Sequence, residues 1–365
     1  MGAGPRPAVA GLSRGRPRRA GARAEVRDRG RGQGADRRAR CRWQQARGRA
    51  HRGADLAGDA ALSGTRAGVV AVVGAPNAGK STLVNALVGA KVSIVSRKVQ
   101  TTRTRIMGIA MRELPDGDRA QILFLDTPGI FRTQKRRLER AMVAAAWRGA
   151  EEGDRIVLVI DAARGLSDDV RAILERLATR ADPKLLVVNK IDLLPREQLL
   201  ALVAEANQSL PFERTFLVSA TKGDGVGDLL DYVASQATPG PFLFPEEQTT
   251  DMPMRQLASE IVREQVFEQL HEELPYEIAV ETEGWQQKKD GSARVECTVH
   301  VARENQRSIV LGKGGAKIKS IGARARRELA EIVGHPVHLF LHVKVSANWA
   351  DDRSRYTAWG LEYDA

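Results

Sequence analysis

Short apolar runs alternate with longer amphipathic segments from residue 67 onward. The apolar runs cover residues 69–73, 122–125, 156–160, 185–188 and 216–218. Helix-like segments lie between them at residues 81–87, 135–147, 168–179 and 196–206. Continuous apolar runs are typical of parallel strands that are buried on both faces. The alternation therefore predicts a doubly wound α/β sheet, in which ligands bind beyond the carboxyl ends of the strands.

A different order of elements follows a segment rich in proline and glycine. Residues 238–241 read Thr-Pro-Gly-Pro, and Pro245 and Pro253 extend this linker. Beyond it we expect a helix over 254–274, strands over 277–283 and 293–302, a glycine-rich turn at 312–315 and a basic helix over 316–333. Residues 337–345 alternate strictly, with valines and leucines facing one way and His338, Phe340, His342 and Lys344 facing the other. This order predicts a second domain of the α+β type.

Residues 1–66 differ in composition from everything that follows them. With 17 arginines, no lysine and five acids, they carry the whole formal net charge of +12, while the other residues hold 40 bases and 40 acids. Few aliphatic or aromatic residues are present to form a core, so this extension is predicted to be disordered. Three explanations are open: a basic arm that contacts RNA, an organelle transit peptide, and a stretch translated from a wrong start, which we favour.

Cysteine content and hydropathy argue against disulfide-bonded, zinc-binding and membrane-spanning classes of protein. Cys41 and Cys297 lie far apart and have no CxxC or CxxH spacing, which argues against disulfides and structural zinc. No apolar run approaches the roughly 18 residues that cross a bilayer. We therefore expect a soluble cytoplasmic protein.

The first sequence motif joins the first apolar run to the first helix. It reads Gly74-Ala75-Pro76-Asn77-Ala78-Gly79-Lys80-Ser81, and Thr82 follows it. Glycines let backbone N–H groups curl around phosphates, and the helix N-terminus adds its positive end. Lys80 would reach the β and γ oxygens of a nucleotide, and the Ser81 hydroxyl would ligate Mg²⁺. Taken alone, the pattern also fits an ordinary glycine-rich turn between a strand and a helix.

Two further segments would complete a phosphate and metal site. Asp126-Thr127-Pro128-Gly129, followed by Ile130, comes directly after the second apolar run. A carboxylate at position 126 can reach the Mg²⁺ sphere, and the Gly129 amide can sense a γ-phosphate. Gln100-Thr101-Thr102-Arg103 lies in a polar stretch suited to a mobile switch loop. One of its threonines, for which we favour Thr102, would complete the Mg²⁺ shell when the γ-phosphate is present.

Two motifs select the base. Asn189-Lys190-Ile191-Asp192 follows the fourth apolar run, and Ser219-Ala220-Thr221 follows the fifth. The Asp192 carboxylate can accept hydrogen bonds from guanine N1–H and the 2-amino group, whereas adenine has no donors there. A backbone amide of the second motif can bind the guanine carbonyl. Five motifs in this order predict a Mg²⁺-dependent GTPase that binds GTP and GDP.

Together these motifs resemble the translation-factor-related small GTPases, and residues 93–106 resemble the Era GTPases more closely still. Ile130 stands where Ras-type sites carry a water-orienting glutamine. In the relatives that the chain resembles, an asparagine of the phosphate loop can hold K⁺ where an arginine finger would act. The resemblance gives this role to Asn77, beside Lys80 and Thr102 as catalytic residues. A purely structural role of Asn77, as a cap of the loop, stays open.

The glycine-rich turn of the second domain, Gly312-Lys313-Gly314-Gly315, is a GxxG loop. Residues 309–311 before it are apolar, and Lys317 and Lys319 follow it on the basic helix. KH domains use this arrangement: the glycines allow a nucleic-acid backbone to approach, and flanking bases bind phosphate. Residues 303–327 hold eight bases and one acid, in a region, 241–365, with 16 bases and 20 acids. Such a stripe fits single-stranded RNA, although the solvated face of an amphipathic helix would look alike.

The resemblance to Era GTPases covers both domains, from about residue 67 to residue 363. It implies a P-loop GTPase domain over 67–240, a linker over 241–262, a type II KH domain over 263–350 and a C-terminal tail over 351–365. It also implies an assembly factor that binds 16S rRNA of the small ribosomal subunit, in the cytoplasm and peripherally at the inner face of the bacterial membrane. We expect a monomer.

Other functions remain open at this point. A GTPase that supports tRNA modification would want an extra helical or catalytic-cysteine domain, for which Cys297 in a β-like run is a poor candidate. A membrane-transport GTPase would need spanning helices. In a third alternative the second domain only docks proteins.

Histidines and tryptophans of the second domain invite two more hypotheses. His335, His338 and His342 resemble a metal cluster, but no third ligand lies near the two that share a strand face, so we disfavour it. Trp349 and Trp359 could stack on bases, yet packing against the domain is the favoured interpretation.

Overall fold

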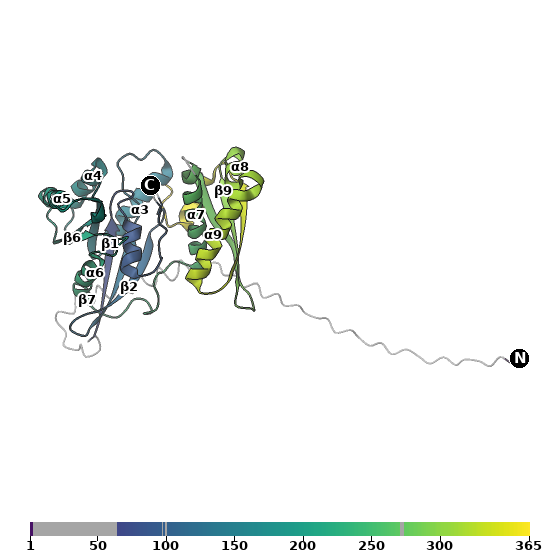
Figure 1. Ribbon diagram of the computed structural model, residues 1–365, viewed down its shortest axis with the longest axis horizontal. Coiled ribbons are helices and arrows are strands. Elements are labelled where there is room, and N and C mark those ends of the chain that lie inside the picture. Colours follow the sequence, from purple (N-terminus) through teal and green to yellow (C-terminus); the bar gives the residue numbers. More distant parts are fainter. Residues whose placement is uncertain (3–63, 97, 99–100, 271–273) are drawn as a thin grey trace.

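The computed structural model of the 365-residue chain describes residues 1–2, 64–96, 98, 101–270 and 274–365. Most of the predicted disordered extension, Cys41 and Gln100 therefore lie outside the described residues. Thr65 and Arg66, at the end of that predicted extension, pair with Arg119 and Ala120 in the first sheet. Figure 1 shows two bodies side by side, each with a sheet and helices packed on it.

The first body contains a seven-stranded sheet in the order β2-β3-β1-β4-β5-β6, with β7 paired to β1. Its strands are β1 (Thr65–Val73), β2 (Ile106–Glu113), β3 (Arg119–Asp126), β4 (Arg155–Asp161), β5 (Lys184–Asn189), β6 (Arg214–Val218) and β7 (Thr238–Pro239). Strands β3, β1, β4, β5 and β6 are parallel, whereas β2 runs antiparallel to β3 and β7 antiparallel to β1. The predicted doubly wound sheet is confirmed, and the antiparallel edge strand β2 was not predicted.

Among the described residues, five helices cover the two faces of this sheet. Side chains of α2 (Lys80–Val88) and α6 (Val226–Ser235) pack on one face, and those of α3 (Arg137–Glu152), α4 (Asp168–Ala178) and α5 (Arg196–Ser209) pack on the other. Val70 and Val72 of β1 belong to the first cluster, and Ala71 and Val73 belong to the second. Both faces need apolar side chains, which explains the continuous apolar run of this strand.

The second body follows the order helix, two strands, two helices, strand. Its elements are α7 (Met254–Gln269), β8 (Ile278–Gln287), β9 (Ala293–Val301), α8 (Glu304–Leu311), α9 (Ala316–Val333) and β10 (Val337–Val345). The sheet order is β10-β9-β8, with β9 parallel to β10 and antiparallel to β8. Apolar residues from the three helices and the inner sheet face form one buried cluster. This arrangement confirms the predicted α+β domain of the type II KH class.

The junction between the two bodies differs from the predicted linker. Residues 241–253 lie against the first sheet, where Gln121 Oε1 accepts hydrogen bonds from the Leu243 and Phe244 amides at 2.8 and 3.0 Å. Helix α7 begins at Met254, so a boundary between residues 262 and 263 would fall inside it. The helix ends at Gln269, short of the predicted end at Leu274, which instead opens a 3₁₀ turn. The domain limits stay predictions.

The end of the chain packs back onto the first body. Trp349 and the helix α10 (Arg353–Ala358) join residues of α3 in a shared apolar cluster, and Figure 1 shows the C-terminus beside α3. Trp349 is only 4% exposed and donates from Nε1 to the Glu277 carbonyl at 3.0 Å. Trp359 is partly buried in the same cluster. The packing interpretation of the two tryptophans is confirmed.

Two further observations bear on the alternatives. Every helix among the described residues is too short or too polar to cross a lipid bilayer. Cys297 is fully buried on β9, and this burial raises the pKa of its thiol to about 11. A thiol with so high a pKa is almost entirely protonated near neutral pH, so Cys297 does not suit a catalytic nucleophile.

Candidate functional site

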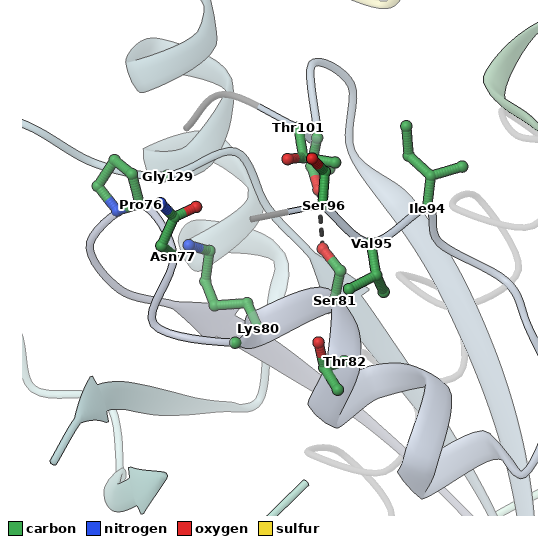
Figure 2. Close-up of a pocket in the computed structure, with 12 residues that line it drawn as sticks. Pro76, Asn77, Lys80, Ser81, Thr82, Ile94, Val95, Ser96, Thr101 and Gly129 are labelled. Atoms are coloured by element: carbon green, nitrogen blue, oxygen red, sulfur yellow. Dashed lines mark hydrogen bonds between the residues drawn. The ribbon is translucent and has the colours of Figure 1, made fainter. Parts of the chain in front are cut away.

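The first motif forms the loop between β1 and α2. Lys80, at the start of α2, is 6% exposed, and its Nζ donates to the Gly74 and Ala75 carbonyls at 3.0 Å each. Burial lowers the pKa of Lys80 to about 8, and the charge of Asp126 opposes this shift. Figure 2 shows the Asn77 and Lys80 side chains beside the space that separates the loop from Ser96 and Thr101. The loop thus holds a desolvated cation where an anionic ligand can approach it.

Two glycines of this loop are required by close contacts. A Cβ on Gly74 would lie 2.4 Å from the Val159 carbonyl oxygen, and one on Gly79 would lie 2.2 Å from Asn189 Nδ2. Gly79 also has a φ of +92°, a region that other residues rarely adopt. Asn77 is one of two described residues other than glycine with a positive φ, at +64°. Asparagine tolerates this conformation better than most residues.

Three oxygen-bearing side chains meet beside Lys80. Ser81 Oγ lies 2.8 Å from Thr102 Oγ1, and Thr102 Oγ1 lies 3.5 Å from Asp126 Oδ2. Asp126 is fully buried, and its Oδ1 has no hydrogen-bond partner within the described parts of the chain. Burial raises the pKa of Asp126, while Ser81 and Lys80 oppose the shift. Two hydroxyls and a buried carboxylate with an unsatisfied oxygen are the donor set of a hard divalent cation.

The choice between the two threonines of the switch stretch follows from their contacts. Thr102 is 6% exposed and faces Ser81, whereas Thr101 Oγ1 donates to the Lys98 carbonyl of its own loop at 2.8 Å. This geometry supports the preference for Thr102.

The second phosphate motif lies directly against the first. A Cβ on Gly129 would meet backbone atoms of Pro76 at 2.9 Å, and the Ile130 amide donates to the Gly74 carbonyl at 3.1 Å. Thr127 Oγ1 donates to the Val72 carbonyl at 2.7 Å, which fixes the start of the turn. Ile130 is 5% exposed and packs in the apolar cluster on the α3 face. Its side chain therefore offers no polar group to position water.

The motifs at residues 189–192 and 219–221 meet through one buried asparagine. Asn189 is 1% exposed; its Nδ2 donates to the Ala78 carbonyl at 2.9 Å, and its Oδ1 accepts from the Ala220 amide at 3.1 Å. Ser219 Oγ donates to Asp192 Oδ1 at 2.8 Å, which lowers the pKa of Asp192 more than any other contact. Asn189 joins the loops, and Asp192 is held as a carboxylate at their edge.

Some residues of the site have no counterpart in the sequence analysis. Asp161, at the end of β4, accepts from Lys190 Nζ at 2.6 Å, and the same Nζ donates to the Asn77 carbonyl at 2.7 Å. Ile94, Val95 and Ser96 line the pocket beside the loop. An aspartate at the end of an apolar strand was a visible indication for Asp161, while the pocket-lining role of the others depends on the path of the chain.

The glycine-rich turn of the second body joins α8 to α9. Gly312, Gly314 and Gly315 have φ values of +69°, +58° and +77°. A Cβ on Gly312 would meet Lys317 Cβ at 2.7 Å, whereas one on Gly314 or Gly315 would meet nothing within 4 Å. The turn is thus open on one side. Large groups can approach its backbone there.

The basic residues around this turn do not all face solvent. Lys313 and Lys319 are exposed, but Lys317 is half-buried and donates from Nζ to the Gln269 carbonyl at 3.3 Å. Ile309, just before the turn, is 53% exposed although it is apolar. The turn therefore combines open backbone, exposed lysines and an exposed apolar side chain, the features of a nucleic-acid groove.

A group of possible metal ligands lies elsewhere in the second body. Glu281, Glu283 and His300 bring their ligand atoms within 4.8 Å of one another. Arg355 Nε already lies 3.2 Å from Glu281 Oε1, and His300 Nε2 lies 3.1 Å from Glu281 Oε2. The pairing of Glu281 with a buried arginine explains this cluster as a link between β8 and α10.

Comparison with known proteins gives the family. A family described as 50S ribosome-binding GTPase matches residues 69–190, and a family described as KH domain matches residues 273–350. GTPase Era of Bradyrhizobium sp. (strain BTAi1) is 58% identical over 299 residues, which cover 82% of this chain and 95% of that protein. GTPase Era of Rhizobium meliloti (strain 1021) is 55% identical and covers 82% of this chain and 94% of its own.

The chain belongs to the Era GTPase family. It is a GTPase that binds guanine nucleotides and hydrolyses GTP. Two Era structures have the same fold: one of Era with MgGDPNP and nucleotides 1506–1542 of 16S ribosomal RNA, and one of an Aquifex aeolicus Era variant bound to GDP·AlF4⁻. Each is 38% identical with a TM-score of 0.75, and covers 81% of this chain and 99% of its own. The fold and activity expected from the Era resemblance are confirmed.

Proposed function

We propose that this Era-family GTPase is an assembly factor for the small ribosomal subunit, which binds 16S rRNA through its KH domain under control of the GTP state. The observation that carries the proposal is the open glycine turn at residues 312–315, on the same chain as a complete guanine-nucleotide site. The Era structure with a 16S rRNA segment supports the choice of RNA.

For the nucleotide site we assign each motif a role. The loop of residues 74–82 would bind the phosphates, with Lys80 as the cation that faces the β and γ oxygens. Gly129 would sense the γ-phosphate, because it lies against Pro76 at the mouth of the loop. Asp192 would accept from the guanine N1–H and 2-amino groups, and a backbone amide of residues 219–221 would donate to the guanine carbonyl. Of these amides, that of Ala220 donates to Asn189 Oδ1 in this structure.

The proposed site includes Mg²⁺. Ser81, Thr102 and Asp126 would hold the ion, directly or through water, because their oxygens converge and one Asp126 oxygen has no partner among the described residues. When bound, Mg²⁺ neutralises charge on the β and γ phosphates. The chain would bring the oxygens of Ser81, Thr102 and Asp126 together only when Thr102 lies beside Ser81.

The proposed hydrolysis mechanism needs a substitute for the missing glutamine. We assign to Asn77 a role in holding K⁺ near the phosphates, since Asn77 lines the pocket and Ile130 has no polar group. Its positive φ of +64° also fits the alternative, in which the side chain only shapes the loop.

Replacing K⁺ by Na⁺ tests the role of Asn77. We expect the GTP turnover of the wild type to fall on the order of 10-fold in Na⁺, because the smaller ion does not fill the same coordination shell. The Asn77→Ala variant should turn over GTP equally slowly in both salts. Phosphate release at fixed ionic strength measures this. Equal rates for the wild type in K⁺ and Na⁺ would remove the K⁺ hypothesis and leave the structural role.

Substitutions in the glycine turn test the RNA role. The Gly314→Asp variant should weaken binding of single-stranded RNA from the 3′ end of 16S rRNA by about 30-fold or more, because it adds a charge and a side chain where backbones must approach. Fluorescence anisotropy measures the affinity. The Gly334→Asp variant is the matched control, since Gly334 has a similar φ of +72° at the other end of α9.

Neutralising the lysines separates charge from shape. Lys319 is exposed and Lys317 is tied to α7, so Lys319→Ala should reduce the salt dependence of RNA binding more than Lys317→Ala does. RNA binding that survives Gly314→Asp and both lysine variants would favour a second domain that docks proteins.

A role in tRNA modification has no support from Cys297, which is buried and protonated. A monomeric state, a cytoplasmic location and peripheral membrane association stay predictions.

A further inference from the structure

Part of the chain between α2 and β2 packs against the second domain. Ile94 of this segment and Ile106, the first residue of β2, belong to the apolar cluster of the KH domain, where both are 1% exposed. Gln256 Nε2 of α7 also donates to Thr104 Oγ1 at 3.5 Å. A segment that lines the nucleotide pocket is therefore packed into the core of the other domain.

Glu264 of α7 makes the first polar attachment. It is 3% exposed, and its Oε1 accepts a hydrogen bond from the Val95 amide at 2.7 Å. Its other oxygen pairs with Lys91 Nζ, which also pairs with Glu328 of α9. Burial raises the pKa of Glu264, and Lys91 opposes the shift. A buried carboxylate is costly unless its partners stay in place, so this contact defines the position of Val95 closely.

Arg103 makes the second attachment, at the other end of the segment. It is 4% exposed, its Nη1 donates to the Ile278 carbonyl at 2.7 Å, and its guanidinium lies 5.6 Å from the centre of the Trp349 ring. Burial and the nearby charge of Arg263 lower the pKa of Arg103 to about 9. The residue directly before it is Thr102, which contacts Ser81 in the nucleotide site.

The segment therefore contacts both domains within a few residues. Val95 is attached to α7 and lines the pocket beside Ser81, while Thr102 faces the nucleotide site and Arg103 faces β8. We propose that Glu264 and Arg103 are positioning residues for GTP hydrolysis, which hold Val95 and Thr102 of the first domain from the second domain so that Thr102 reaches the γ-phosphate side of the site.

This arrangement also connects the nucleotide to the RNA-facing turn. Helix α7 packs along α9, Lys317 near the start of α9 donates to the Gln269 carbonyl at the end of α7, and Glu328 of α9 pairs with Lys91. Through these contacts we expect a change at Val95 to alter the helix that begins at the glycine turn. This part of the inference rests on the proposed RNA-binding function, whereas the positioning of Thr102 does not.

The Glu264→Ala variant tests the positioning role. Thr102 is needed only when a γ-phosphate is present, so loss of the Val95 contact should weaken binding of a non-hydrolysable GTP analogue about 10-fold relative to GDP. The kcat for GTP hydrolysis should fall by a similar factor. The Glu264→Gln variant keeps an oxygen that can accept from the Val95 amide, so its ratio of analogue to GDP affinity should stay within about threefold of the wild type.

A control variant and an alternative test variant make the outcome decisive. Glu268→Ala removes an exposed carboxylate from the same helix, so its affinities should match the wild type. If Glu264→Ala does not fold, Arg103→Met serves instead, because it keeps the apolar stem and removes the guanidinium that donates to Ile278 and lies over Trp349; the same selective loss is expected. Equal weakening of GDP and analogue, or no change in either variant, would overturn the proposal.

RNA binding provides the second measurement. The wild type should bind the 16S rRNA segment with different affinities in its GDP and GTP-analogue forms, and Glu264→Ala should bring the two affinities together. If the wild type binds no RNA, the proposed function fails, while the nucleotide affinities still decide the role of Glu264. If the wild type shows a difference that Glu264→Ala leaves intact, the proposed connection to the glycine turn is wrong.

Discussion

The Lys80→Met variant is expected to hydrolyse GTP on the order of 100- to 1,000-fold more slowly than the wild type. The substitution removes a desolvated positive charge that would stabilise the phosphoryl group during its transfer. Methionine keeps the apolar stem of a side chain that is 6% exposed. Burial lowers the pKa of Lys80 to about 8, so the amine is still mostly charged near neutral pH. This buried charge lowers the stability of the nucleotide-free protein.

The same reasoning gives a second result for this variant. Without nucleotide, Lys80→Met should unfold at a temperature equal to or above that of the wild type, since it replaces a buried charge by an apolar group. Single-turnover phosphate release and calorimetry measure the two effects. The exposed Lys344, in the other domain, provides the control variant Lys344→Met. Hydrolysis by Lys80→Met within threefold of the wild type would contradict the assigned role.

The Asp192→Asn variant is expected to lose GTP affinity by about 100-fold or more and to gain affinity for xanthosine triphosphate. Two charge-assisted hydrogen bonds from guanine are lost, each worth roughly 1.5–3 kcal/mol. Xanthine carries a carbonyl in place of the 2-amino group, and an asparagine amide can donate to it. Ser219 already holds this side chain at 2.8 Å, so the amide is positioned as the carboxylate was.

A matched charge change separates base recognition from electrostatics. Asp224→Asn removes the same charge from an exposed position of the neighbouring turn, so its GTP affinity should stay near that of the wild type. Competition between GTP and xanthosine triphosphate, measured with a fluorescent GDP analogue, compares the variants. If Asp192→Asn prefers GTP as strongly as the wild type does, the base is recognised elsewhere in the site.

Local sequence patterns predicted most strands of the first domain. The five parallel strands are apolar on both faces, so each appears in the sequence as a short continuous apolar run. Strand β2 escaped detection because it contains Gly108 and follows a polar stretch. Its place is decided by neighbours: a Cβ on Gly108 would meet Val88 and Val84 of α2 at 2.8 and 3.0 Å. Packing of this kind has no trace in the local pattern.

The sequence places the candidate nucleotide motifs directly after apolar runs, and the loops that follow parallel strands meet at one edge of a doubly wound sheet. Asn189 therefore contacts both the Ala220 amide and the Ala78 carbonyl of the first motif, although the three residues are far apart in the chain. The class of the second domain could be predicted from the sequence for another reason. A glycine turn that needs positive φ values and a helix with one basic face are both local properties of the chain.

By itself, the sequence determined the class of each domain, the guanine specificity and the phosphate loop, since these depend on residue types at fixed spacings beside single strands. Only the tertiary structure decided how the domains meet. Glu264 and Arg103 are ordinary charged residues in the sequence, yet both are almost fully buried against the other domain. Contacts between residues more than 150 positions apart depend on the docking of two finished domains, and no local periodicity encodes that.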